Sequence, residues 1–269
     1  MDLAVRRHFA DLSHGQLHYA ACGDPAAAPV LLLHQTPRSW LEYAQVLPVL
    51  GTRYRALAMD TVGFGDSEPL AGPASIEGWA QAAVGLLDAL GVDRAHVVGH
   101  HTGGVIAVEL GAVHGQRVRS LVLSSTPYTN EPFRLARAQR PPIDAVEASP
   151  DGDHLTELWR KRQGFYPKDR PDLLQAFVLD ALKVRGDVEG GHRAVARYEM
   201  EGKVSRLHAL PTLIVHAPDD PFASPHTVEW QHLLPQAQVA TVPGAMVPLP
   251  DQLPQAFAQA VLNFLDGVA

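Results

Sequence analysis

Cysteine is almost absent from the chain: Cys22 is the single cysteine among 269 residues. A lone thiol cannot form an intramolecular disulfide, so the fold cannot depend on one. Long apolar runs are also missing, and no stretch is long enough to cross a bilayer. The first twelve residues contain arginines but no apolar core of the kind that directs export. We therefore expect a cytoplasmic protein.

Positive charge is scarce as well. Lysine and arginine number 22 against 29 acidic residues, which gives a formal net charge of -7. Nucleic acids and anionic membranes both favour a basic surface, so we expect neither as a partner. A small neutral or weakly charged substrate is favoured instead, bound by a monomer or a homodimer. No ligand spacing typical of a metal site is present, and we expect neither a metal nor a cofactor.

What the chain has is enough apolar material for one large core. Hydrophobic residues make up 46% of the sequence and charged residues 19%, which fits one α/β domain with an insertion. Apolar runs predict buried strands, and longer amphipathic patterns predict helices between them. An N-terminal hairpin turning at 13–15 starts the sheet. The predicted strands are 29–34, 54–59, 118–123, 211–216 and 238–242, and the predicted helices are 76–90, 102–113 and 253–265. A further helical pattern follows Pro37, with Trp40, Tyr43, Ala44 and Leu47 at helical spacing.

The segment 130–207 differs from the rest because it has no strand pattern. Its helical stretches are interrupted by Pro141-Pro142, by 150–152 and by Gly190-Gly191. We expect a helical insertion whose clearest helices are 155–162 and 171–184. The spaced arginines Arg134, Arg137 and Arg140 are interpreted as a solvated helix face rather than an anion clamp.

The most informative motif is His96-Val97-Val98-Gly99-His100-His101-Thr102-Gly103-Gly104, in which a β-branched run enters a glycine turn and continues as a helical pattern. It resembles the nucleophile elbow of the α/β-hydrolase family, Gly-His-Ser-x-Gly-Gly, with His101 in place of the serine. The resemblance implies an α/β-hydrolase fold, a mostly parallel sheet flanked by helices. It also implies a helical cap, or lid, at 130–207 after the sixth strand, with 1–129 and 208–269 as the core.

Further motifs extend the resemblance. His34-Gln35-Thr36-Pro37 is similar to the family's His-Gly-x-Pro turn, so the amides of Gln35 and Thr102 are expected to form an oxyanion hole. The loop 60–67 resembles a glycine-containing family loop and is given a structural role. Asp220 takes the position of the catalytic acid, with Asp219 as the alternative. Val247 stands where the resemblance predicts the catalytic histidine, and no histidine lies beyond Leu233.

Two members of a Ser-His-Asp relay are therefore missing, and His101 is the candidate for the chemistry. A neutral imidazole beside an oxyanion hole could act as a general base toward water, or as a nucleophile, on an ester, a lactone or an activated carbon–carbon bond. Two alternatives remain: a cofactor-independent lyase, decarboxylase or cyclase, and an inactive binding protein. The expected pocket residues are His34, His100, Ser125, Met246 and Val247.

Overall fold

The computed structural model describes residues 3–13, 15–69 and 72–268. Its centre is one eight-stranded sheet with the order β1-β2-β4-β3-β5-β6-β7-β8. Pairing is antiparallel from β1 through β2 to β4 and parallel across the remaining strands. The strands are β1 (Arg6–Leu12), β2 (Gly15–Cys22), β3 (Pro29–Leu33), β4 (Arg55–Met59), β5 (Ala95–His100), β6 (Val118–Ser124), β7 (Thr212–His216) and β8 (Gln238–Thr241).

Helices cover both faces of the sheet because the central strands are apolar on both sides. On β3, Leu31 and Leu33 belong to one core cluster, while Val30 and Leu32 belong to the other. The first cluster also contains α2 (Ile76–Ala89), α3 (Thr102–Val113) and Trp230 of α8 (His226–Leu233). The second contains residues of α1 (Leu47–Leu50), α9 (Leu249–Gln252) and α10 (Pro254–Asp266).

The predicted architecture is confirmed, and most element limits agree to within two residues. One difference follows Pro37, where a continuous helical pattern was expected. The chain forms only a short 3-10 helix, η1 (Trp40–Tyr43), and the single turn of α1, since Pro48 cannot extend an existing helix. His14, in the predicted hairpin turn, lies outside the described residues. None of the described helices combines the length and apolarity needed to span a membrane.

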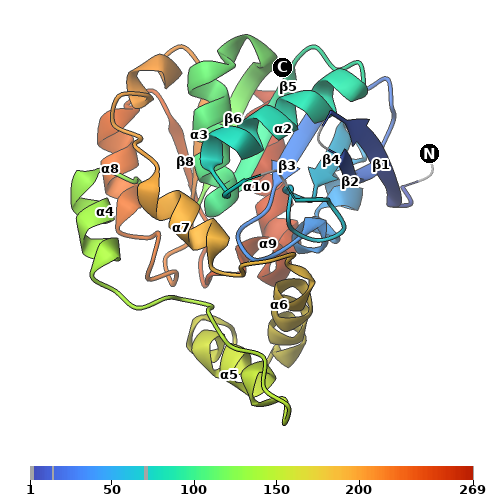
Figure 1. Ribbon diagram of the computed structural model, residues 1–269. Coiled ribbons are helices and arrows are strands. Elements are labelled where there is room, and N and C mark those ends of the chain that lie inside the picture. The colour runs from blue at the N-terminus through green and yellow to red at the C-terminus, as the bar shows by residue number, and fades with distance from the viewer. Residues whose placement is uncertain (1–2, 14, 70–71, 269) are drawn as a thin grey trace.

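The inserted segment runs between β6 and β7. It contains α4 (Glu131–Ala138), α5 (Asp153–Arg162), η3 (Gln163–Phe165), α6 (Pro171–Lys183), α7 (Gly190–Arg197) and η4 (Val204–Leu207). Figure 1 shows α5 and α6 projecting from the rest of the molecule at the bottom of the view. These two helices enclose an apolar cluster of their own, which includes Leu158, Tyr166 and Phe177. In contrast, Ala194 and Val195 of α7 pack into the core of the sheet.

The topology brings distant segments together at one edge of the sheet. β3, β5, β6 and β7 are parallel neighbours, so the loops after them emerge side by side. Those loops carry Gln35, His101, Ser125 and Asp220 in turn. α/β proteins bind their ligands at the carboxyl edge of the parallel sheet. In this chain, these four predicted site residues all follow strands at that edge.

Candidate active site

His101 occupies a strained turn between β5 and α3. Its φ and ψ are 46° and -112°, in a region that non-glycine residues rarely adopt. The turn closes because its flanking glycines lack a Cβ. A Cβ on Gly99 would collide with the Gly103 carbonyl, and one on Gly103 with the Leu33 carbonyl. The strand, turn and helix therefore hold the His101 side chain at the tip of β5.

The His101 ring contacts the predicted acid directly. Its Nε2 lies 2.7 Å from Oδ2 of Asp220, and the two side chains are 14% and 0% exposed. The other carboxylate oxygen, Oδ1, accepts hydrogen bonds from the backbone N–H groups of Phe222 and Ala223 at 3.0 and 3.2 Å. The alternative acid, Asp219, is exposed and makes no such contact. The geometry therefore pairs His101 with Asp220, which follows β7.

The environment of Asp220 keeps its carboxylate ionised. Burial on its own would raise the pKa of Asp220. The adjacent His101 and the backbone donor at Phe222 outweigh burial, and the pKa falls to about 2. Because Oδ2 is an acceptor at neutral pH, Nε2 of His101 must carry the hydrogen of the bond between them. In the neutral form of the ring, the other nitrogen, Nδ1, then carries no hydrogen and can accept a proton.

His100 precedes His101 in the chain but has a different environment. It is fully buried, and both of its ring nitrogens are occupied, by Ser124 Oγ and by the Val247 carbonyl, each at 2.9 Å. Burial is the main cause that lowers the pKa of His100 to about 4, so the ring is neutral at pH 7. The expectation that His100 lines the substrate pocket is wrong. The side chain fastens β5 to β6 and to the loop after β8.

The expected oxyanion hole is only partly free. The Gln35 N–H donates to Glu42 Oε2 at 2.9 Å, so the prediction of an open Gln35 amide is wrong. Glu42 is fully buried and also accepts from the Gln35 side chain, which fixes the turn in this orientation. The next amide, that of Thr36, lies 3.4 Å from Thr102 Oγ1, a long and weak contact. Thr102 opens α3, and the N–H of a first helical residue has no partner within its helix.

A cavity of about 750 Å³ opens over this site. That volume lies within the range of small-molecule pockets, roughly 300–1,000 Å³. Its floor comes from the sheet edge and includes Gln35, His101, Thr102 and Val247. Its wall comes largely from the inserted segment. That wall includes Phe133, Arg137, Arg140, Ile143, Lys161, Arg162, Phe165, His192 and Val195.

Three other expected pocket residues also lie outside the cavity lining. His34 is buried, with its Nδ1 2.7 Å from the Gln35 carbonyl and its Nε2 accepting from the Thr61 amide. Ser125 is buried with φ 45°, and its hydroxyl has no hydrogen-bond partner among the described residues. Met246 is half-buried in the turn before Val247. His34, Ser125 and Met246 are thus not among the residues that line this cavity.

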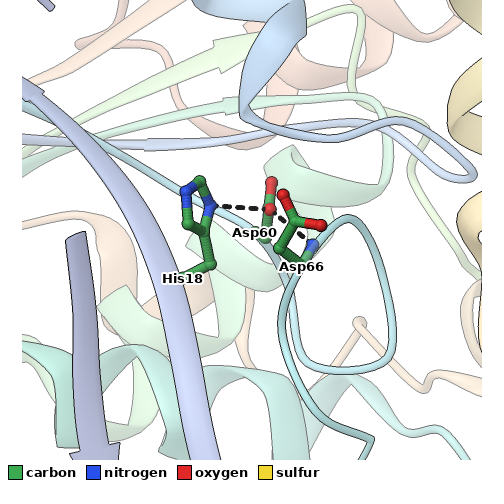
Figure 2. Close-up of side chains that lie close together, drawn as sticks. All are labelled: His18, Asp60 and Asp66. Atoms are coloured by element: carbon green, nitrogen blue, oxygen red, sulfur yellow. Dashed lines mark hydrogen bonds and ion pairs between the residues drawn. The ribbon is translucent and has the colours of Figure 1, made fainter. Parts of the chain in front are cut away.

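A group of acidic and histidine side chains lies away from the cavity, where His18 of β2 contacts the loop 60–67. Figure 2 shows His18, Asp60 and Asp66 facing one another. Asp60 Oδ2 is 2.9 Å from both His18 Nδ1 and the Asp66 amide, and Oδ1 accepts from the Trp40 amide at 2.7 Å. Asp66 in turn pairs with Lys183 of α6. These bonds give the loop the structural role predicted for it.

A second such group lies inside the inserted segment. Asp144 Oδ1 accepts from Arg162 Nε at 2.6 Å, and Oδ2 contacts both Arg162 Nη2 and His192 Nε2. Glu189 accepts from Arg137 and from the amides of Ile143 and Asp144. The carboxylates are thus already neutralised by arginine, and the group holds α5, α7 and the irregular stretch after α4 together.

A buried ion network attaches the insertion to the core. Arg38, in the loop after β3, contacts Asp180 of α6 at 2.9 Å and Asp251 of α9 at 2.6 Å. Ser39 also donates to Asp180 at 2.8 Å. Burial raises the pKa of Asp251 to about 6 despite the nearby Arg38. These contacts fix α6 beside the turn that carries Gln35 and Thr36.

The fold and this site define a class of protein. The family model described as "alpha/beta hydrolase fold" matches residues 28–246, and the chain belongs to that family. A 2-hydroxy-6-oxononadienedioate/2-hydroxy-6-oxononatrienedioate hydrolase of Dechloromonas aromatica is 36% identical over 228 residues, covering 77% of this chain and 75% of that protein. A 2-hydroxymuconate semialdehyde hydrolase of a Pseudomonas strain is 36% identical over 112 residues, and this match spans only 40% of each chain.

Solved structures agree on the fold. The enol-lactonase of Burkholderia xenovorans LB400 superposes with a TM-score of 0.80 at 22% identity, over 96% of this chain and 100% of that one. A hydrolase from Pseudomonas aeruginosa gives a TM-score of 0.78 at 24% identity, over 97% and 98% of the two chains.

Sequence reasoning missed most of the cavity wall. The elbow and the acid follow motifs of fixed spacing, but the wall residues come from α4, α5 and α7, which have none. One signal was present: Arg137 lies on α4, and Arg140 follows two residues after its end. Arg140 is exposed, as expected for a solvated side chain, and both arginines also line the cavity.

Proposed function

We propose that the chain is a hydrolase of small carbonyl compounds, esters or lactones first among them, in which His101 and Asp220 form a catalytic pair. The observation that carries the proposal is the 2.7 Å contact between His101 Nε2 and Asp220 Oδ2 at the floor of the cavity. In a Ser-His-Asp enzyme the acid orients a histidine that serves the serine. Here the histidine at the elbow contacts the acid itself, and Val247 stands where the third member was expected.

The proposed step uses water as the nucleophile. His101 Nδ1 removes a proton from water while the oxygen bonds to the carbonyl carbon, and the carbonyl π electrons move onto its oxygen. The tetrahedral intermediate then re-forms the carbonyl and expels the alkoxide or enolate. That leaving group takes the proton from Nδ1, which restores the neutral ring. Asp220 remains ionised throughout and stabilises the transient imidazolium.

The oxyanion formed in this step requires donors. The amide of Thr102, at the start of α3, is one, and the helix dipole there also favours negative charge. The Thr36 amide is the second donor in this proposal, because its one hydrogen bond to a described residue is the 3.4 Å approach to Thr102 Oγ1. An incoming oxyanion would give this N–H a stronger acceptor than the hydroxyl.

The insertion at 130–207 acts as a cap in this proposal. Its residues supply most of the cavity wall, and α5 and α6 have an apolar cluster separate from the core. A product of a suitable ester, added to saturation, should slow amide hydrogen exchange in α4 and α5 more than in β3 and β5. Uniform protection across the cap and the strands would contradict a gating role.

The relatives agree with a carbonyl substrate, since one is named a semialdehyde hydrolase and a structural neighbour an enol-lactonase. Turnover of a panel of aryl esters and lactones in ¹⁸O-labelled water tests the proposal. Hydrolysis places the label in the carboxylic acid product. Turnover without label would indicate the lyase or cyclase alternative, and tight binding without turnover the inactive one.

A further inference from the structure

We infer that the cavity recognises an anionic group, a carboxylate in the first instance, on the substrate it holds. The inference rests on the proposed function, which places the reacting carbonyl group of the substrate beside His101. It concerns a different part of the cavity, the wall formed by the cap. Four cationic side chains line that wall: Arg137, Arg140, Lys161 and Arg162. The sequence alone favoured a neutral or weakly charged substrate.

Two of the four cations have their charge balanced inside the protein. Arg137 pairs with Glu189 at 3.0 Å, and its other terminal nitrogen donates to the carbonyls of Arg140 and Pro141. Arg162 is paired with Asp144 through Nε and Nη2. The contribution of Arg137 and Arg162 to the net charge of the wall is therefore close to zero.

The charges of the other two cations are less completely balanced. Arg140 makes no ion pair with any described residue, and Lys161 Nζ is 3.6 Å from Glu157, an exposed partner. On the same wall, Glu229 accepts from the Asn130 side-chain amide at 3.0 Å and lies 3.5 Å from His226, and it keeps its negative charge. Arg140 is therefore the cation of this wall that no carboxylate of a described residue contacts, and an anionic group of the substrate could pair with it.

Arg162 adds a directed donor. Its side chain is only 5% exposed, yet it lines the cavity, and its Nη1 makes no hydrogen bond with a described residue. The pairing with Asp144 and the packing over the Phe177 ring at 5.0 Å fix the plane of the guanidinium. A fixed guanidinium edge suits a carboxylate better than a hydroxyl, because each charge-assisted hydrogen bond is about twice as strong.

Two matched esters test the inference. The p-nitrophenyl monoester of glutaric acid and p-nitrophenyl hexanoate have acyl chains of similar length, and only the first ends in a carboxylate. We expect the charged ester to have a kcat/KM about tenfold higher. In a variant with both Arg140→Ala and Lys161→Ala, that preference should disappear, because the kcat/KM of the charged ester should fall about tenfold more than that of the neutral ester. Arg160→Ala, an exposed neighbour on α5 outside the cavity lining, is the matched control.

Binding separates this inference from the proposed function. Calorimetric titration with glutarate and with the uncharged pentanediol needs no turnover and can be repeated in His101→Gln. Glutarate should bind in both proteins and weaken about tenfold in the Arg140/Lys161 variant. Glutarate binding without ester hydrolysis would support the anion site and would contradict the proposed chemistry. Equal affinity for glutarate and the diol, or no effect of the double substitution, would overturn the anion site.

Discussion

Two histidine–aspartate pairs in this molecule have nearly the same geometry. His101 and Asp220, in the core, approach to 2.7 Å with side-chain exposures of 14% and 0%. His192 and Asp144, in the inserted segment, also approach to 2.7 Å, with exposures of 15% and 0%. The difference lies in the third partner. Asp144 is bound by the Arg162 guanidinium, whereas Asp220 receives only backbone amides beside its histidine.

The third partner decides what each pair can do. A carboxylate neutralised by arginine gives little further stabilisation to an imidazolium, so the Asp144 pair serves to hold the inserted segment together. Among the described residues, Asp220 has no cation other than its histidine in direct contact, and its charge is available when His101 takes up a proton. Distance alone does not identify a catalytic pair.

The largest effect is expected for Asp220→Asn. The amide oxygen would keep the bonds from Phe222 and Ala223, so its NH₂ group would face His101 Nε2. That contact places the ring hydrogen on Nδ1 and removes the base, and kcat should fall roughly 10² to 10⁴-fold. Steady-state kinetics on the best ester of the panel measures the loss, and circular dichroism confirms folding. A fall of less than about threefold would contradict the role of Asp220.

Asp144→Asn should produce the opposite pattern. It leaves the Arg162 guanidinium buried with an incomplete partner, and breaking a buried ion pair costs roughly 3–5 kcal/mol of folding free energy. Urea unfolding monitored by fluorescence measures this loss. The kcat per folded molecule should remain within about threefold of the wild type, since Asp144 does not contact His101. A catalytic defect as large as that of Asp220→Asn would erase the distinction between the pairs.

A smaller effect concerns His100. Its folded pKa of about 4 lies below the unfolded value of roughly 6.5. The neutral ring therefore contributes stability that is fully present above pH 6.5 and is lost as the pH falls toward 4. The expected loss is roughly 3 kcal/mol. Unfolding free energies across this range should fall less steeply in His100→Gln, while exposed His208→Gln leaves the slope unchanged. An unaltered slope in His100→Gln would show that the ring is protonated without penalty.

The sheet and the elbow could be predicted from sequence because both depend on local patterns. Continuous apolar runs identify parallel strands, and Gly99 and Gly103 are required by steric contacts that any residue with a Cβ would violate. The position of Asp220 follows from its place after a strand. Once the strands are ordered, its contact with His101 follows from the topology.

The rest depended on side-chain competition that spacing does not reveal. The Gln35 amide was expected to face the substrate, but a carboxylate seven residues later, Glu42, accepts from it instead. His34 and His100 were expected in the pocket because they adjoin the motifs. Both rings are buried instead, and they are hydrogen-bonded to the Thr61 amide and to Ser124 Oγ respectively. The cap wall is built by tertiary packing of helices with no motif, so the positive charge of Arg140 and Lys161 in the cavity became visible only in the structure.

The most direct test of the central claim is the kcat of His101→Gln in ¹⁸O-labelled water. Glutamine retains much of the volume and can still donate to Asp220, but it cannot accept a proton at neutral pH. If His101 is the base, the rate of label incorporation should fall roughly 10² to 10⁴-fold while the Tm shifts by no more than a few degrees. Label incorporation within a few fold of the wild-type rate would show that the base is another group and would contradict the account.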